Sequence, residues 1–209
     1  MKISKTEIAL DRIEIMYHKY GTQIFMGHSG GKDSTVLLHL VQQIIPNIML
    51  VHNVKPMLGE SNDPVSKLTE MHPYTLDFIY RNVARSNLIH FMPASNMKKF
   101  IKNYGLVCQI DGSRACEYTR KGKSSEIVRD GAQVSRDTMT EVVETGLFDL
   151  TMSYPIYDWS DDDIFDYIFK HGLQISSEYI DNCEIFNYFM RKDASKLSFV
   201  GEEKCLNLS

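Results

Sequence analysis

The most constraining feature of this chain is a glycine turn between two apolar runs. The first run is Ile24-Phe25-Met26, and the second extends with helical spacing over residues 35–45. The turn between them contains Ser29, Gly30, Gly31, Lys32, Asp33 and Ser34. This order predicts a strand, a tight turn and a helix. Glycines let backbone N–H groups approach an anion closely, and the positive end of the helix dipole points to the same place. The junction therefore predicts a phosphate-binding loop.

The carboxylate of Asp33 distinguishes this loop from the Walker A loop. Walker A requires Gly five residues before its Gly-Lys pair and Ser or Thr directly after it, whereas Met26 and Asp33 stand there. A carboxylate among phosphates needs a cation, so Asp33 predicts bound Mg²⁺. The hexapeptide instead resembles the pyrophosphate loop of the N-type ATP pyrophosphatases, which split ATP between its α- and β-phosphates.

Length and composition indicate one globular domain. The chain has 209 residues, 43% hydrophobic and 24% charged, and we expect a single nucleotide-binding domain over 1–209 with 171–209 as a C-terminal helical appendage and tail. No apolar stretch approaches the ~20 residues that span a bilayer, and the N-terminus lacks a signal-peptide core, so no membrane association and a cytoplasmic location are expected. A net charge of −4 does not indicate nucleic-acid binding.

The four cysteines are too scattered to predict a metal site. Cys108, Cys116, Cys183 and Cys205 form no Cys-x-x-Cys pair, so we expect no iron–sulfur cluster and reduced thiols. Cys116 lies between two arginines, which favours a reactive thiolate, but a buried unreactive thiol is the open alternative.

Strand and helix signals alternate along the chain. Strands are predicted at 22–27, 48–52, 88–92, 106–111 and 148–153, and helices at 4–19, 33–45, 94–104, 136–145 and 160–170. A long loop at 54–71 and a helix start at Pro73 fall between the second and third strands. The pattern predicts an α/β fold with an open, mostly parallel sheet and helices on both faces. Ligands of such sheets bind at the carboxyl ends of the strands, where the glycine loop would lie.

A second cluster follows the fourth predicted strand. Its candidate site residues are Gly112, Arg114, Glu117 and Arg120. Arginine forks suit phosphate or sulfate, and a neighbouring carboxylate can orient one of them. The alternative is a solvated basic loop with a surface ion pair. Because this loop is polar, we expect Arg114 to bind an anion without being needed for folding.

Two further groups of residues allow two interpretations each. The acidic residues at 158–163 could hold a metal, but Ser160 followed by Asp163 is better interpreted as a helix N-cap. His28, just before the loop, could contact phosphate or make a local hydrogen bond.

Three motifs in this order resemble the phosphoadenosine phosphosulfate reductase family. They are Ser-Gly-Gly-Lys-Asp-Ser, then Gly-x-Arg-x-x-Glu-x-x-Arg, and finally the Tyr154–Phe165 block that contains Pro-Ile-x-x-Trp. The segment His72-Pro73-Tyr74-Thr75 is similar to a helix start in that family. The resemblance covers about 24–170 and implies an adenine nucleotide α-hydrolase-like fold. The family includes adenylyl sulfate reductases, the small subunit of ATP sulfurylase and DNA-sulfur-modification proteins.

The loop favours one activity within that family. It keeps the ATP-pyrophosphatase form, which implies binding of ATP or a related adenine nucleotide and Mg²⁺-dependent adenylyl transfer to an anionic acceptor. Lys32, Asp33, Arg114 and Arg120 would then be catalytic. The alternative is thiol-dependent reduction of an adenylyl sulfate by Cys205, although the tail Glu203-Lys204-Cys205-Leu206-Asn207 lacks the Gly and His of the reductases' Glu-Cys-Gly-Leu-His. A non-catalytic nucleotide-binding subunit of a complex is a third alternative, and a homo-oligomer or a partner subunit is left open.

Overall fold

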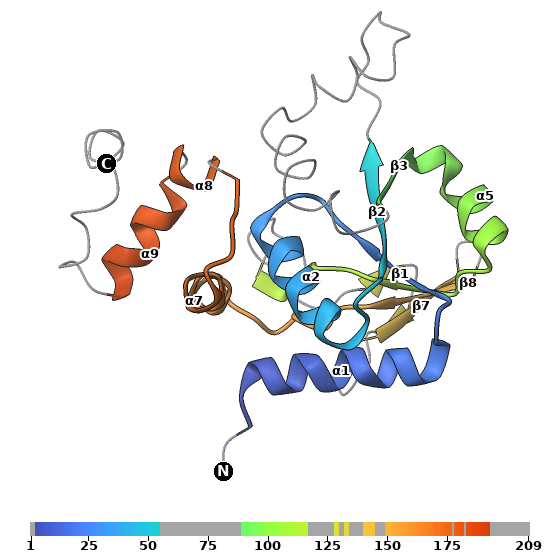
Figure 1. Cartoon of the computed structure of the whole chain (residues 1–209), viewed down its shortest axis with the longest axis horizontal. Coiled ribbons are helices and arrows are strands. Elements are labelled where there is room, and N and C mark those ends of the chain that lie inside the picture. The colour runs from blue at the N-terminus through green and yellow to red at the C-terminus, as the bar shows by residue number, and fades with distance from the viewer. Residues whose placement is uncertain are drawn as a thin grey trace, which may run out of the picture.

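The computed structural model describes residues 3–54, 89–116, 128–129, 132–133, 140–144, 149–176, 178–181 and 183–192. Its elements, in chain order, are α1 (Lys5–Tyr20), β1 (Ile24–Gly27), α2 (Lys32–Ile44), β2 (Met49–Val54), β3 (Ile89–Pro93), α5 (Ala94–Tyr104), β4 (Cys108–Ile110), β5 (Val128–Arg129), β6 (Ala132–Gln133), β7 (Thr140–Glu144), β8 (Asp149–Ser153), α7 (Asp161–His171), α8 (Glu178–Asp181) and α9 (Glu184–Lys192) (Figure 1). Apart from Val54, the predicted loop at 54–71 lies outside these ranges, as does the helix start at Pro73. None of the described helices combines the length and the apolar character that crossing a membrane requires.

The main sheet is parallel except at one edge. Its strand order is β3-β2-β1-β4-β8-β7, and only β7 pairs antiparallel with its neighbour. The chain order reverses at β1, because β2 and β3 lie on one side of it while β4 and β8 lie on the other. Ligands of doubly wound sheets bind at such a switch point, beyond the carboxyl ends of the strands. The glycine loop follows β1 at this point.

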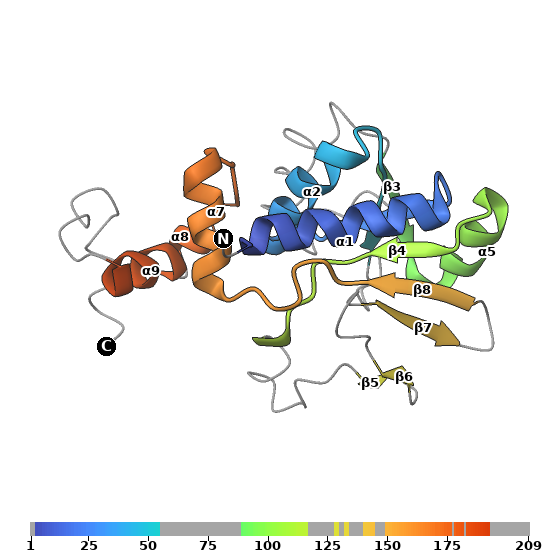
Figure 2. The ribbon, with the colours of Figure 1, turned by 90° about the horizontal axis from the view of Figure 1, so that it is seen from below.

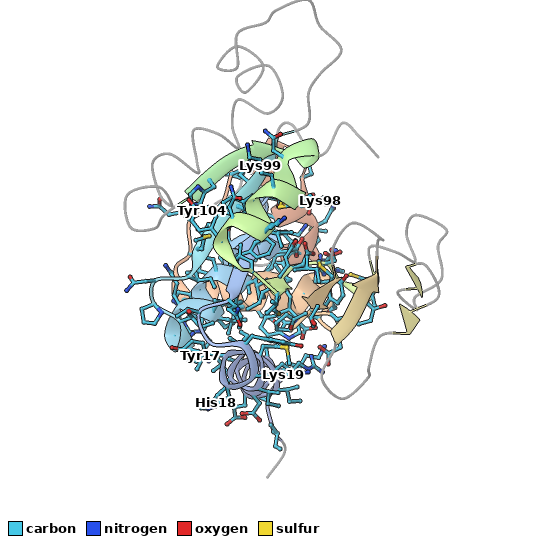
Figure 3. The ribbon with its side chains drawn as sticks, turned by 90° about the vertical axis from the view of Figure 1, so that its right-hand side faces the viewer. Tyr17, His18, Lys19, Lys98, Lys99 and Tyr104 are labelled. Carbon is cyan, nitrogen blue, oxygen red and sulfur yellow. The ribbon has the colours of Figure 1, made fainter. Side chains whose placement is uncertain are left out.

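Helices cover both faces of the sheet, as predicted. Ile24 and Met26 of β1 pack in a cluster with residues of α1, α2 and α7, whereas Phe25 packs on the other face with Phe100 and Ile101 of α5. This alternation follows from the two-residue period of a strand. Figure 3 shows α1 and α5 on opposite sides of the sheet.

Two helices begin at capping boxes. The Ser4 side chain accepts from the Glu7 backbone N–H and Glu7 reaches back to Ser4, which starts α1. Ser160 and Asp163 make the same reciprocal pair at the start of α7. The interpretation of Ser160 as an N-cap is therefore confirmed.

The helix predicted at 136–145 is wrong over its second half. Residues Thr140–Glu144 form strand β7, which pairs antiparallel with β8 from Thr140 opposite Ser153 to Glu144 opposite Asp149 (Figure 2). The β-branched residues of Thr-Glu-Val-Val-Glu favour a strand, and pairing with β8 across a short connection stabilises it. A mixed sheet with an antiparallel edge strand is a common variant of this architecture.

Candidate functional site

The glycine loop folds into a compact turn between β1 and α2. Gly30 has φ of 84°, a left-handed conformation that only glycine adopts readily. The Gly30 N–H donates to His28 Nδ1 at 3.1 Å, and the Gly31 N–H donates to Ser29 Oγ at 3.2 Å. Ser34 Oγ donates to the Gly31 carbonyl at 2.9 Å. These hydrogen bonds give the loop a defined shape directly before the N-terminus of α2.

Lys32 is buried against the C-terminal helices. It is 6% exposed, its Nζ lies 3.1 Å from Glu184 Oε2, and Asp33 Oδ2 is 3.8 Å away. The ammonium also lies over the rings of Tyr179 and Phe165, with distances to the ring centroids of 4.9 and 5.9 Å. The Lys32 backbone N–H donates to the Tyr179 hydroxyl at 2.9 Å. Side chains from α8 and α9 thus meet the loop at the positions expected for phosphate.

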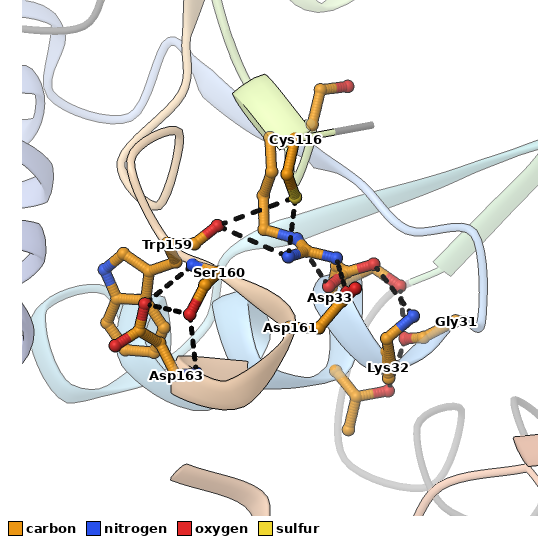
Figure 4. A network of polar contacts seen from close by, with 12 residues as sticks. Gly31, Lys32, Asp33, Cys116, Trp159, Ser160, Asp161 and Asp163 are labelled. Carbon is orange, nitrogen blue, oxygen red and sulfur yellow. Dashed lines mark hydrogen bonds and ion pairs between the residues drawn. The ribbon is translucent and has the colours of Figure 1, made fainter. Parts of the chain in front are cut away.

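Arg114 ties the loop to α7. Its side chain is fully buried, with Nε 2.8 Å from Asp33 Oδ1 and Nη2 2.8 Å from Asp161 Oδ1. Nη1 donates to Cys116 Sγ at 3.1 Å and to the Trp159 carbonyl at 3.3 Å. Burial lowers the pKa of Arg114, but the carboxylates of Asp33 and Asp161 outweigh burial and raise it above its ordinary value. Figure 4 labels Asp33, Asp161 and Cys116, the three residues whose side chains contact this guanidinium.

The expectation that Arg114 is dispensable for folding conflicts with this burial. Arg114 lies in a polar loop of the sequence, yet its side chain is enclosed between the first turns of two helices. Arg114 could therefore affect anion binding either by contacting the anion or by holding the Asp33 carboxylate in place.

Gly112 brings the second sequence cluster against the first. A Cβ atom at this position would come within 3.3 Å of the Ser34 backbone nitrogen and 3.4 Å of the Asp33 carbonyl carbon. The turn after β4 thus packs directly on the first turn of α2 because it lacks a side chain. The structure brings together the loop, Gly112 and Arg114, whereas Glu117, Arg120 and Cys205 lie outside the described residues.

His28 was expected either to contact phosphate or to make a local hydrogen bond, and the structure shows the local hydrogen bond, from the Gly30 N–H. It is 2% exposed, and burial together with the nearby His52 lowers its pKa to about 3. The imidazole is therefore neutral, and since Nδ1 accepts from Gly30, its proton is on Nε2. Nε2 is buried, and none of the described residues forms a hydrogen bond with it.

The cysteines differ from the expected set of reduced thiols. Cys108 lies in β4 within the core, where burial raises the pKa of its thiol to about 12. Cys183 is disulfide-bonded, and its partner lies outside the described residues. Within the described ranges, no group of three or more His, Cys, Asp or Glu side chains is arranged to hold a metal ion. Mg²⁺ at Asp33 stays a prediction.

Three residues of this site escaped the sequence analysis. Asp161 was considered as part of an acidic metal site or of a helix cap, but not as the partner of Arg114 that it is. Tyr179 and Glu184 belong to no motif, and their contacts with Lys32 span about 150 residues of sequence. The apolar residues around Tyr179 and Glu184 predict helices that pack on the domain, but they do not predict contacts with Lys32.

The fold and loop define an α/β protein of the adenine nucleotide α-hydrolase-like class. The chain belongs to the phosphoadenosine phosphosulfate reductase domain family, whose profile matches residues 60–184, more than half of its length. A curated relative, the adenosine 5'-phosphosulfate reductase of Staphylococcus haemolyticus (strain JCSC1435), is 24% identical over 180 residues, covering 80% of this chain and 70% of the relative.

Two solved structures share this fold. The FMN adenylyltransferase of Candida glabrata, in complex with FMN and the ATP analogue AMPCPP, superposes with a TM-score of 0.58 at 14% identity, covering 84% of this chain and 61% of that chain. Yeast FAD synthetase in complex with FAD superposes with a TM-score of 0.54 at 15% identity, covering 86% of this chain and 64% of that chain. The chain thus spans less than two thirds of both proteins, and at this identity the similarity shows the fold alone.

Proposed function

We propose that the loop binds the β- and γ-phosphates of ATP and that the protein catalyses Mg²⁺-dependent adenylyl transfer with release of pyrophosphate. The observation that carries this proposal is the arrangement at the start of α2. A glycine turn, a buried lysine and two serine hydroxyls surround the helix N-terminus, which is where backbone N–H groups and the helix dipole favour an anion. The Lys32 backbone N–H donates to the Tyr179 hydroxyl, so this position already holds an oxygen acceptor. This supports the proposal that a phosphate oxygen can bind there.

The proposed reaction is an in-line displacement at the α-phosphorus. An oxygen of an anionic acceptor forms a bond to this phosphorus while the bond to the bridging α,β-oxygen breaks. Pyrophosphate leaves with the electron pair, and the loop N–H groups and Lys32 stabilise its negative charge. Charge stabilisation and positioning of this kind dominate catalysis of phosphoryl-type transfers.

Two carboxylates and two guanidiniums are proposed to support this reaction. Asp33 would hold Mg²⁺, which would neutralise phosphate charge when bound. Arg114 contacts Asp33 at 2.8 Å and would position its carboxylate. From their place in the sequence, Arg120 and Glu117 are proposed to help hold the anionic acceptor.

Reduction of an adenylyl sulfate is the second candidate. It is favoured by the family and by the similarity to an adenosine 5'-phosphosulfate reductase. In this reaction a thiolate attacks the sulfur of adenylyl sulfate, the sulfur–oxygen bond to the nucleotide breaks, and AMP leaves with the electron pair. An external thiol then attacks the protein sulfur, which releases sulfite and leaves the two thiols oxidised to a disulfide. Cys205, in its reduced form, is the proposed nucleophile of this alternative, whereas adenylyl transfer requires no thiol.

Product analysis separates the two candidates. The purified protein would be incubated with Mg²⁺-ATP and sulfate, and separately with adenylyl sulfate or phosphoadenylyl sulfate and dithiothreitol, while pyrophosphate and sulfite are measured. We expect pyrophosphate from ATP, no sulfite, and undiminished ATP–pyrophosphate exchange in Cys205→Ser. Sulfite release that is lost in Cys205→Ser, without pyrophosphate release from ATP, would establish the reductase instead.

A further inference from the structure

A tyrosine hydroxyl occupies the N-terminus of α2. Tyr179 of α8 is 7% exposed, and its hydroxyl accepts from the Lys32 backbone N–H at 2.9 Å. A Cβ atom at Gly31 would lie only 3.0 Å from the same hydroxyl oxygen. This oxygen therefore lies where backbone N–H groups at a helix start would hold a phosphate oxygen.

A carboxylate from the next helix neutralises the lysine of the loop. Glu184 begins α9, and its Oε2 lies 3.1 Å from Lys32 Nζ. A phosphate that contacts this ammonium would bring its own negative charge beside the Glu184 carboxylate, and two anions at one cation repel each other. Phosphate binding and the Glu184 contact therefore compete.

Tyr179 lies on a short helix that is separate from the anchored part of α9. The later part of α9 is anchored to α7, because Tyr188 donates to Asp166 at 2.6 Å and Arg191 pairs with Asp162 at 2.7 Å. In contrast, α8 is a single turn of four residues, and such short helices have little stability of their own. Cys183, between the two helices, has φ of 58°, an uncommon and strained conformation for a residue other than glycine.

We propose that α8 together with Glu184 forms a gate over the phosphate loop. The Tyr179 hydroxyl and the Glu184 carboxylate take the places of two phosphate oxygens until pyrophosphate or a nucleoside triphosphate displaces them. The closed gate lowers the apparent affinity for phosphate groups, because only the open fraction of molecules binds them. This inference rests on the proposed function, since it assumes that the loop binds phosphates.

Titration with inorganic pyrophosphate tests the gate. We expect Tyr179→Phe and Glu184→Gln each to bind pyrophosphate about five-fold more tightly than the wild type, since each loses one contact that closes the gate. Tyr104→Phe and Glu14→Gln make the same chemical changes at exposed positions on α5 and α1, and should leave the affinity unchanged. Hydrogen exchange of amides at 178–184 should become faster in the wild type when pyrophosphate binds.

The outcomes separate the gate from the phosphate site itself. If the wild type binds pyrophosphate but the two gate variants bind it equally or more weakly, the gate is wrong while the phosphate site stands. Weaker binding in both would make Tyr179 and Glu184 part of the binding site. If neither the wild type nor any variant binds pyrophosphate, the proposed function fails and the gate fails with it.

Discussion

Replacing Arg114 by leucine is expected to lower the free energy of unfolding by about 3 kcal/mol, the lower end of the range for removing one partner of a buried ion pair. The guanidinium is fully buried between Asp33 and Asp161, so its loss leaves two carboxylates without this cation. We expect the lower end of this range because the Asp33 and Asp161 side chains are 16% and 31% exposed and therefore stay partly hydrated. Urea unfolding at neutral pH measures the difference.

Arg191→Leu is the matched control for this experiment. Arg191 also pairs with an aspartate of the first turn of α7, Asp162, but its side chain is 50% exposed. Exposed pairs contribute about 0–1 kcal/mol, so this variant should remain close to the wild type. Equal stability of Arg114→Leu and Arg191→Leu would show that the buried guanidinium does not hold the loop and α7 together.

Acid should destabilise the wild type more steeply than a His28→Asn variant. The pKa of His28 is about 3 in the folded protein, whereas an unfolded histidine titrates near 6.5. Below about pH 6.5 the unfolded chain therefore binds a proton that the native state does not, and stability is lost as the pH falls toward 3. This group alone should contribute up to about 1.4 kcal/mol per pH unit, or roughly 2–3 kcal/mol between pH 6 and pH 4.

The slope of unfolding free energy against pH is the quantity to compare. Asparagine keeps an acceptor for the Gly30 N–H and does not titrate, so His28→Asn should have a shallower slope even if its absolute stability is lower. Parallel slopes for the wild type and His28→Asn would mean that the buried imidazole is protonated in the native state.

The elements of the fold were predictable where local pattern and tertiary packing agree. Helix α1 lies close to its predicted range of 4–19, and the alternation of apolar strands with amphipathic helices predicted the parallel sheet. Strand β7 was missed because its residues at 140–144 were assigned from a short polar-apolar pattern, while the partner that makes it a strand is β8. Pairing between strands is a tertiary effect that a helix-period pattern does not contain.

The site was predictable only where neighbouring residues build it. The glycine loop is a local turn, so its position and its relation to the α2 N-terminus follow from six consecutive residues. The burial of Arg114 depends on Asp161, which is 47 residues away in the sequence. Similarly, Tyr179 reaches Lys32 across 147 residues, so no motif could indicate that the loop is covered.

The most direct test of a phosphate site at residues 29–34 is calorimetric titration of pyrophosphate into the wild type and Lys32→Met. Methionine keeps the approximate size of the buried side chain but removes its charge. We expect the wild type to bind and Lys32→Met to bind at least about ten-fold more weakly, because it loses a charged hydrogen bond. Lys98→Met, at an exposed position of α5, should bind like the wild type. Equal affinity of the wild type and Lys32→Met, or no binding by the wild type, would contradict the account.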